Sequence, residues 1–99
     1  IVKTCLASSS NNFKTACFDS LGFIAAESKD VGVIIDTCKS IGNLAYSASC
    51  TKSAAGELIF QNVPDWQKKA PEICSSLLEN YQEECFGYIQ KIQIDYQRI

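Results

Sequence analysis

The chain has 99 residues, of which 46% are hydrophobic and 20% charged, a composition that predicts one folded domain over residues 1–99 rather than a disordered chain. The formal net charge of −2 argues against a protein that binds nucleic acid or docks on an anionic membrane surface. No apolar run approaches the ~20 residues that cross a bilayer, so the sequence predicts no membrane-spanning helix.

The first predicted helix covers residues about 12–27. Its apolar residues recur at helical spacing, and Asn11 or Asn12 is the expected N-cap, because a short polar side chain can accept a hydrogen bond from the first turn. The predicted buried face consists of Phe13, Ala16, Cys17, Leu21, Ile24 and Ala25.

The second predicted helix covers residues about 30–48, with Asp30 as its N-cap. Its start, VGVII, is rich in β-branched residues and is also compatible with a strand. The 3.6-residue period continues beyond that run, however, and therefore favours a helix. The apolar stripe consists of Val31, Ile34, Ile35, Cys38, Ile41 and Ala45.

The segment 51–70 is the least regular part of the chain. Within it, SAAGELIF is compatible with a short helix that ends near Val63, because a residue before proline prefers extended geometry. Pro71 suits the first turn of a helix, where its missing N–H costs nothing, and an apolar seam then continues to about residue 97. The sequence thus predicts an all-α, disulfide-stapled domain with three main helices, about 12–27, 30–48 and 71–97.

Six cysteines in a chain this short predict three disulfides and an oxidising, extracellular environment. The chain begins IVKTC and contains no methionine, which is the pattern expected after removal of a signal peptide. We therefore expect a secreted protein, and we expect it to be monomeric.

The expected pairing of the cysteines follows from the predicted helices. Inside an unbroken third helix, the Cα atoms of Cys74 and Cys85 would lie roughly 16 Å apart, whereas a disulfide needs about 4.4–6.8 Å. A continuous second helix likewise separates Cys38 from Cys50, and an antiparallel arrangement brings both to the third helix instead. The favoured set is Cys5–Cys17, Cys38–Cys85 and Cys50–Cys74; a set with Cys17–Cys38, in which Cys5 and Cys50 both reach the third helix, stays open.

The chain contains no histidine, which excludes Ser-His-Asp and Cys-His catalysis and any histidine-based zinc site. Bonded sulfurs would offer no thiolate to a substrate or a metal. The densest acidic group, Glu79, Glu83 and Glu84, has the helical spacing of a solvated face, and no D-x-D-x-D-G calcium loop occurs. We therefore expect a protein that is not an enzyme and that uses no cofactor or metal.

The stretch VPDWQKKAP is the best candidate for a contact surface. Trp66, the only tryptophan, lies between two prolines and beside Asp65, Lys68 and Lys69. Tryptophan is enriched at interface hot spots, so these four residues are the predicted partner-binding site. The alternative is that Trp66 folds back and covers the apolar end of the packed helices.

Two main classes of function fit a rigid helical scaffold without catalytic groups. One is a binding module that blocks an extracellular protein. The other is a carrier of a lipid or odorant, which we disfavour because a domain of this size has little room for a cavity of ~300 Å³ or more. A secreted signalling or venom peptide is a third possibility.

The segments IVKTCLASSSNNFKTAC and KKAPEICSSLLENYQEEC, together with the six-cysteine helical layout, resemble the small anticomplement salivary proteins of blood-feeding sand flies. Salivary complement inhibitors of anopheline mosquitoes are likewise compact, disulfide-bonded and helical. The resemblance implies an injected inhibitor that binds a host plasma component and blocks complement, in particular the classical pathway, without enzymatic activity. It carries no functional residues over to this chain.

Overall fold

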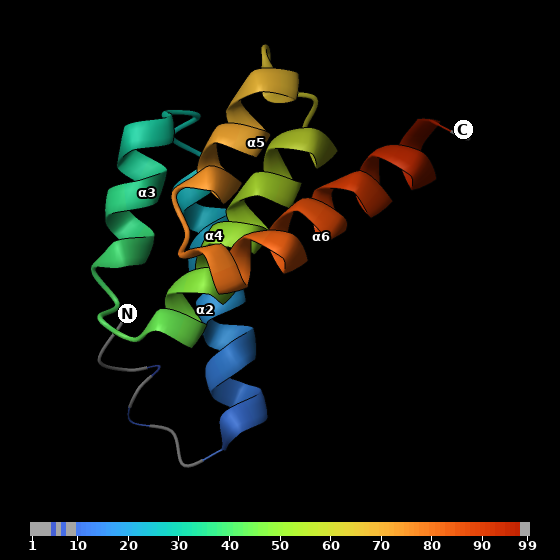
Figure 1. The fold of residues 1–99 in the computed structure, drawn as a ribbon. Helices are drawn as coiled ribbons and strands as arrows, with labels where there is room; N and C mark the ends of the chain where they lie inside the picture. Colours follow the sequence, from blue (N-terminus) through green and yellow to red (C-terminus); the bar gives the residue numbers. More distant parts are fainter. Residues whose placement is uncertain (1–4, 6, 8–9, 98–99) are drawn as a thin grey trace.

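The computed structural model describes residues 5, 7 and 10–97, and this part of the chain contains five α-helices and no strand (Figure 1). They are α2 (Asn11–Ala26), α3 (Val31–Lys39), α4 (Leu44–Phe60), α5 (Trp66–Ser75) and α6 (Glu79–Gln97). None of these helices is both long and apolar enough to cross a membrane. The prediction of an all-α fold is confirmed, but two of the three predicted main helices are broken.

The first predicted helix is close to α2, although its cap differs. Ser10, rather than Asn11 or Asn12, is the N-cap, and its side chain accepts a hydrogen bond from the Phe13 N–H at 3.3 Å. The predicted cap of the second helix is confirmed, because the Asp30 carboxylate accepts from the Val33 N–H at 3.0 Å.

The predicted helix 30–48 is wrong, because the chain turns between α3 and α4. Gly42 adopts a φ of 79°, a left-handed conformation that an L side chain rarely adopts. Asn43 then caps α4, and its side chain accepts from the Tyr46 N–H at 3.0 Å. The new helix runs to Phe60 and so includes the SAAGELIF segment.

The predicted helix 71–97 is also wrong. α5 begins at Trp66, which places Pro71 inside it, and it ends at Ser75. In the link to α6, the helix break removes the usual hydrogen bonds from the amide four residues on, and side chains donate to the carbonyl groups instead. The Ser76 hydroxyl donates to the Ile73 carbonyl at 2.6 Å, and the Gln82 side-chain amide donates to the Leu77 carbonyl at 2.7 Å.

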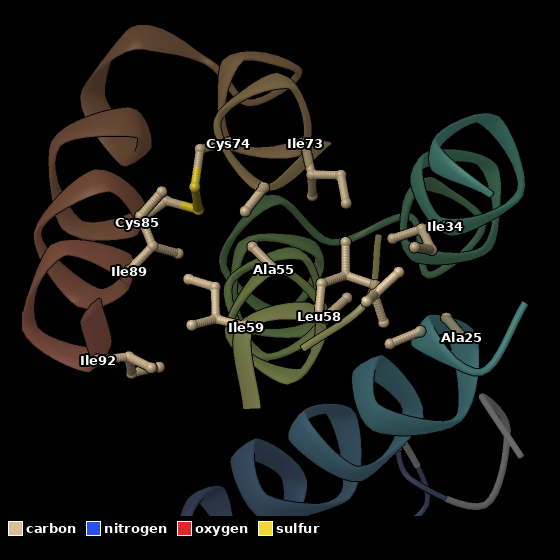
Figure 2. Packing of buried hydrophobic residues seen from close by; sticks show 14 residues of the cluster. Ala25, Ile34, Ala55, Leu58, Ile59, Ile73, Cys74, Cys85, Ile89 and Ile92 are labelled. Carbon is tan, nitrogen blue, oxygen red and sulfur yellow. A yellow bond between two sulfur atoms is a disulfide. The ribbon is translucent and has the colours of Figure 1, made fainter. Parts of the chain in front are cut away.

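The other helices surround α4, which supplies the centre of the core (Figure 2). Leu58 and Ile59 of α4 lie between Ile34 of α3, Ile73 of α5 and Ile89 of α6. α2 approaches α4 closely at Gly22, where a Cβ atom would overlap the Cys50 carbonyl oxygen. A second, smaller buried cluster contains Cys5, Phe18, Leu21, Cys38, Ile41 and Cys50.

The three disulfides are Cys5–Cys17, Cys38–Cys50 and Cys74–Cys85, with Cα–Cα distances of 5.6, 5.5 and 5.5 Å. The first agrees with the prediction. The predicted bonds Cys38–Cys85 and Cys50–Cys74 are wrong, as is the alternative set with Cys17–Cys38. The reason is the two helix breaks, since each lets the chain reverse and brings together two sulfurs that a continuous helix would hold apart.

Candidate functional site

The residues predicted to contact a partner lie at the start of α5. Trp66 is the first residue of this helix, and its half-buried ring packs against the main core cluster. Its indole N–H donates to the Asn62 side chain at 3.3 Å. Asn62 follows the end of α4 with a φ of 50°, so this contact ties α5 to the terminus of α4. Trp66 therefore has a packing role.

The other three predicted contact residues have different surroundings. Lys69 extends across to the α2–α3 turn, where its ammonium group donates to the Lys29 carbonyl at 3.0 Å. Asp65 and Lys68 are exposed, and the Asp65 side chain makes no capping hydrogen bond to α5. Two of the four predicted contact residues therefore make contacts within the protein: Trp66 joins α5 to the end of α4, and Lys69 joins α5 to the α2–α3 turn.

We expect Trp66→Ala to lower the free energy of unfolding by about 2 kcal/mol, less than the loss for a fully buried tryptophan because the side chain is only partly buried. Lys68→Ala, two residues away and exposed, should change stability by less than about 0.5 kcal/mol. Urea unfolding of both variants measures the difference. Equal stability of the two variants would contradict the packing role.

A more prominent apolar surface lies on α2, on the side that faces away from α4. Phe13, Phe23 and Ile24 there are 42–53% exposed. The Ser20 hydroxyl between them donates to the Ala16 carbonyl at 3.0 Å, which reduces the polarity of this strip. We call Phe13, Ala16, Ser20, Phe23 and Ile24 the α2 outer face.

The predicted buried face of α2 is partly wrong. Leu21 and Ala25 are buried as predicted, but Phe13, Ala16 and Ile24 are exposed. Phe18, Gly22 and Ala26 are buried as well, although they were not part of the predicted face. α2 is apolar on both sides, so the periodicity of the sequence did not identify which side meets α4.

A groove of about 380 Å³ lies beside Tyr81. We call it the Tyr81 groove; its lining residues are Lys39, Leu44, Ser47, Thr51, Ser76, Leu77, Leu78 and Tyr81. A smaller hollow of about 140 Å³ also borders Tyr81 and is lined by Ala45, Ala48, Ser49, Lys52, Glu84 and Cys85. Both hollows are open at the surface, so the space for a ligand lies in a groove between helix ends and not in a cavity enclosed by the helices.

The Tyr81 groove exists because of the two helix breaks. Lys39 ends α3 and Leu44 begins α4, so both lie next to the first break. Ser76, Leu77 and Leu78 form the second break. Prediction from the sequence treated both segments as helix interior and therefore missed the groove, although the Gly42-Asn43 pair is a recognisable turn signal.

The described residues offer neither a free thiol nor a cluster of metal ligands. All six cysteines are bonded, and no group of three or more His, Cys, Asp or Glu residues in this part of the chain could hold a metal ion. Glu79, Glu83 and Glu84 are exposed along α6, and Glu84 pairs with Lys52 at 3.1 Å. These carboxylates form a solvated helix face.

Comparison with known proteins does not indicate which surface is functional. No family model, no curated protein and no solved structure matches the chain. The α2 outer face and the Tyr81 groove are therefore interpreted from their own geometry and chemistry.

Proposed function

We propose that this protein is a secreted, non-enzymatic inhibitor that binds a host plasma protein and blocks complement, with the classical pathway as the first candidate. The resemblance to sand fly salivary proteins supports the choice of complement. Three disulfides in a small domain, with no membrane-crossing helix among those described, are consistent with an extracellular location.

The observation that carries the proposal is the α2 outer face. Two phenylalanines and an isoleucine on one side of a single helix provide the aromatic and aliphatic anchors that dominate protein interfaces. Exposing them to water is unfavourable, and exposed apolar side chains that gather on one face typically mark an interaction site.

The helix that carries this face is held rigidly. The Cys5–Cys17 bond anchors its first half, and the close approach of Gly22 to the α4 backbone fixes its second half. The Ser53 hydroxyl adds a hydrogen bond to the Asp19 carboxylate at 3.0 Å. A preorganised helix loses little conformational entropy on binding, which favours tight association.

The shape of this face fits a protein partner rather than a small ligand. It is the outer side of a helix, and neither of the two hollows described above includes any of its residues. The residues of the α2 outer face follow one another at spacings of three and four, at positions 13, 16, 20 and then 23 or 24, and this spacing suits insertion of the helix into a groove on another protein.

The test is lysis of antibody-sensitised erythrocytes by human serum, with and without the protein. We expect inhibition by the wild type. Phe23→Ala and Ile24→Ala should each raise the half-inhibitory concentration by about thirtyfold, the equivalent of a ~2 kcal/mol hot spot. Val33→Ala on α3 removes a similarly exposed apolar side chain and should leave inhibition unchanged.

The outcomes test the inhibition of complement and the role of the α2 outer face separately. Absence of inhibition by wild-type protein at micromolar concentration would remove the complement proposal. Inhibition that both α2 variants retain would show that another surface makes the contact. Repeating the assay with serum restricted to the alternative pathway identifies which pathway is blocked.

A further inference from the structure

The Tyr81 groove combines an apolar interior with exposed apolar edges. Leu44 and Leu78 are 60% and 54% exposed, the two highest values among the large apolar side chains that the structure describes. Both line this one groove, together with Leu77 and the Tyr81 ring. A ligand in the groove would cover side chains that otherwise remain in water, which provides a favourable free energy of binding.

The volume limits the ligand to a small molecule. At about 380 Å³, the groove lies near the lower end of the range of roughly 300–1,000 Å³ for small-molecule sites. Leucine side chains from both α4 and the α5–α6 link line the groove and can contact one alkyl chain. This volume suits a ligand with one alkyl chain better than a lipid with two.

The polar groups of the groove favour an anionic head group. Lys39 is the only residue with a charged side chain among those that line it. The Thr51 and Ser76 hydroxyls donate to the Ser47 and Ile73 carbonyls at 2.7 and 2.6 Å, so their protons are already used within the protein. The Lys39 ammonium is therefore the strongest donor available to a ligand.

We propose that the Tyr81 groove binds an unbranched alkyl carboxylate of medium chain length. The alkyl chain lies against Leu44, Leu77, Leu78 and Tyr81, and the carboxylate pairs with Lys39 at the edge. This site shares no residue with the α2 outer face and goes beyond the proposed inhibition of a host protein. It gives the chain a ligand-binding activity that does not require the complement proposal to be correct.

Calorimetric titration with a series from hexanoate to dodecanoate, below the micellar concentration, tests the site. We expect one ligand per chain and up to about fourfold tighter binding for each added methylene, because each buries more apolar surface. The gain should stop once the groove is filled. Leu78→Gln should abolish most binding, whereas Ile94→Gln, a matched change at a similarly exposed residue of α6 outside the groove, should not affect it.

The head group is tested separately. Lys39→Gln should weaken the binding of decanoate about fivefold at low salt, the effect of one exposed ion pair, and should leave decanol unaffected. Leu78→Gln should also retain the wild-type inhibition of complement, which distinguishes this proposal from the previous one. Equal loss in Leu78→Gln and Ile94→Gln, no dependence on chain length, or no effect of Lys39→Gln would each overturn the assignment.

Discussion

A variant with both Cys74 and Cys85 replaced by alanine is expected to lose about 3 kcal/mol of unfolding free energy. The bond closes a short loop, with a sequence separation of 11, and the loss corresponds to the chain entropy that such a loop removes from the unfolded state. Both sulfurs are buried in the main core cluster, so the bond also fixes α5 against α6. Urea unfolding gives the value, provided that the free energies extrapolated to water are compared, since opening the loop also changes the denaturant slope.

The matched variant replaces Cys38 and Cys50. Its loop has a separation of 12, so the expected loss is nearly the same. If both variants lose less than about 1 kcal/mol of unfolding free energy, these bonds do not stabilise the fold by restricting the unfolded chain.

Peptide mapping without reduction tests the pairing directly. Trypsin cleaves after Lys14 and Lys39 and thus separates the partners of the first two bonds, and a glutamate-specific protease cleaves after Glu79 and separates Cys74 from Cys85. We expect three linked peptide pairs, each joining cysteines that are neighbours in the sequence. A peptide that joins Cys38 to Cys85 would restore the pairing predicted from continuous helices and would contradict both helix breaks.

Gly22→Ala is expected to lower the unfolding free energy by about 1–3 kcal/mol, although alanine favours a helix by about 1 kcal/mol over glycine. The new Cβ would overlap the Cys50 carbonyl oxygen and lie 3.1 Å from the Ala54 nitrogen. Both are backbone atoms of α4, so no side-chain rotation can relieve the contact. The two helices must move apart, and the packing around Phe18 and Leu21 loosens with them.

Gly87→Ala is the control for this prediction. Gly87 lies inside α6, and a Cβ atom there would meet nothing within 4 Å. Without a clash, the better helix propensity of alanine should raise stability by up to ~1 kcal/mol. Thermal unfolding of the two variants should therefore show shifts of opposite sign; an increase in both would mean that α2 and α4 are not in close contact at Gly22.

Features that depend on neighbouring residues could be predicted from the sequence. The Asp30 cap was correct because a carboxylate three residues before an amide can accept its hydrogen bond whatever the rest of the fold does. The Cys5–Cys17 bond was correct because the polar SSSNN stretch between the two cysteines argued against a continuous helix. The approximate extent of α2, though not its N-cap, followed from the same local information.

The break between α5 and α6 could not be predicted in this way. Ser76, Leu77 and Leu78 include neither glycine nor proline, and two of the three are leucines, which are strong helix formers. The break is stabilised by Gln82, by the Ser76 hydroxyl and by the Cys74–Cys85 bond, which forms only if the chain reverses. The helix prediction excluded that bond, and the bond in turn requires the helix to break.

The sequence by itself determined the all-α class, the approximate extent of α2, the cap of α3 and one disulfide, because hydrophobic periodicity and capping act over a few residues. Only the tertiary structure decided which side of α2 is buried, where two predicted helices break and which cysteines pair. The α2 outer face and the Tyr81 groove belong to this second group. Both arise from the packing of segments around α4, and the free energy of that packing depends on residues far apart in the sequence.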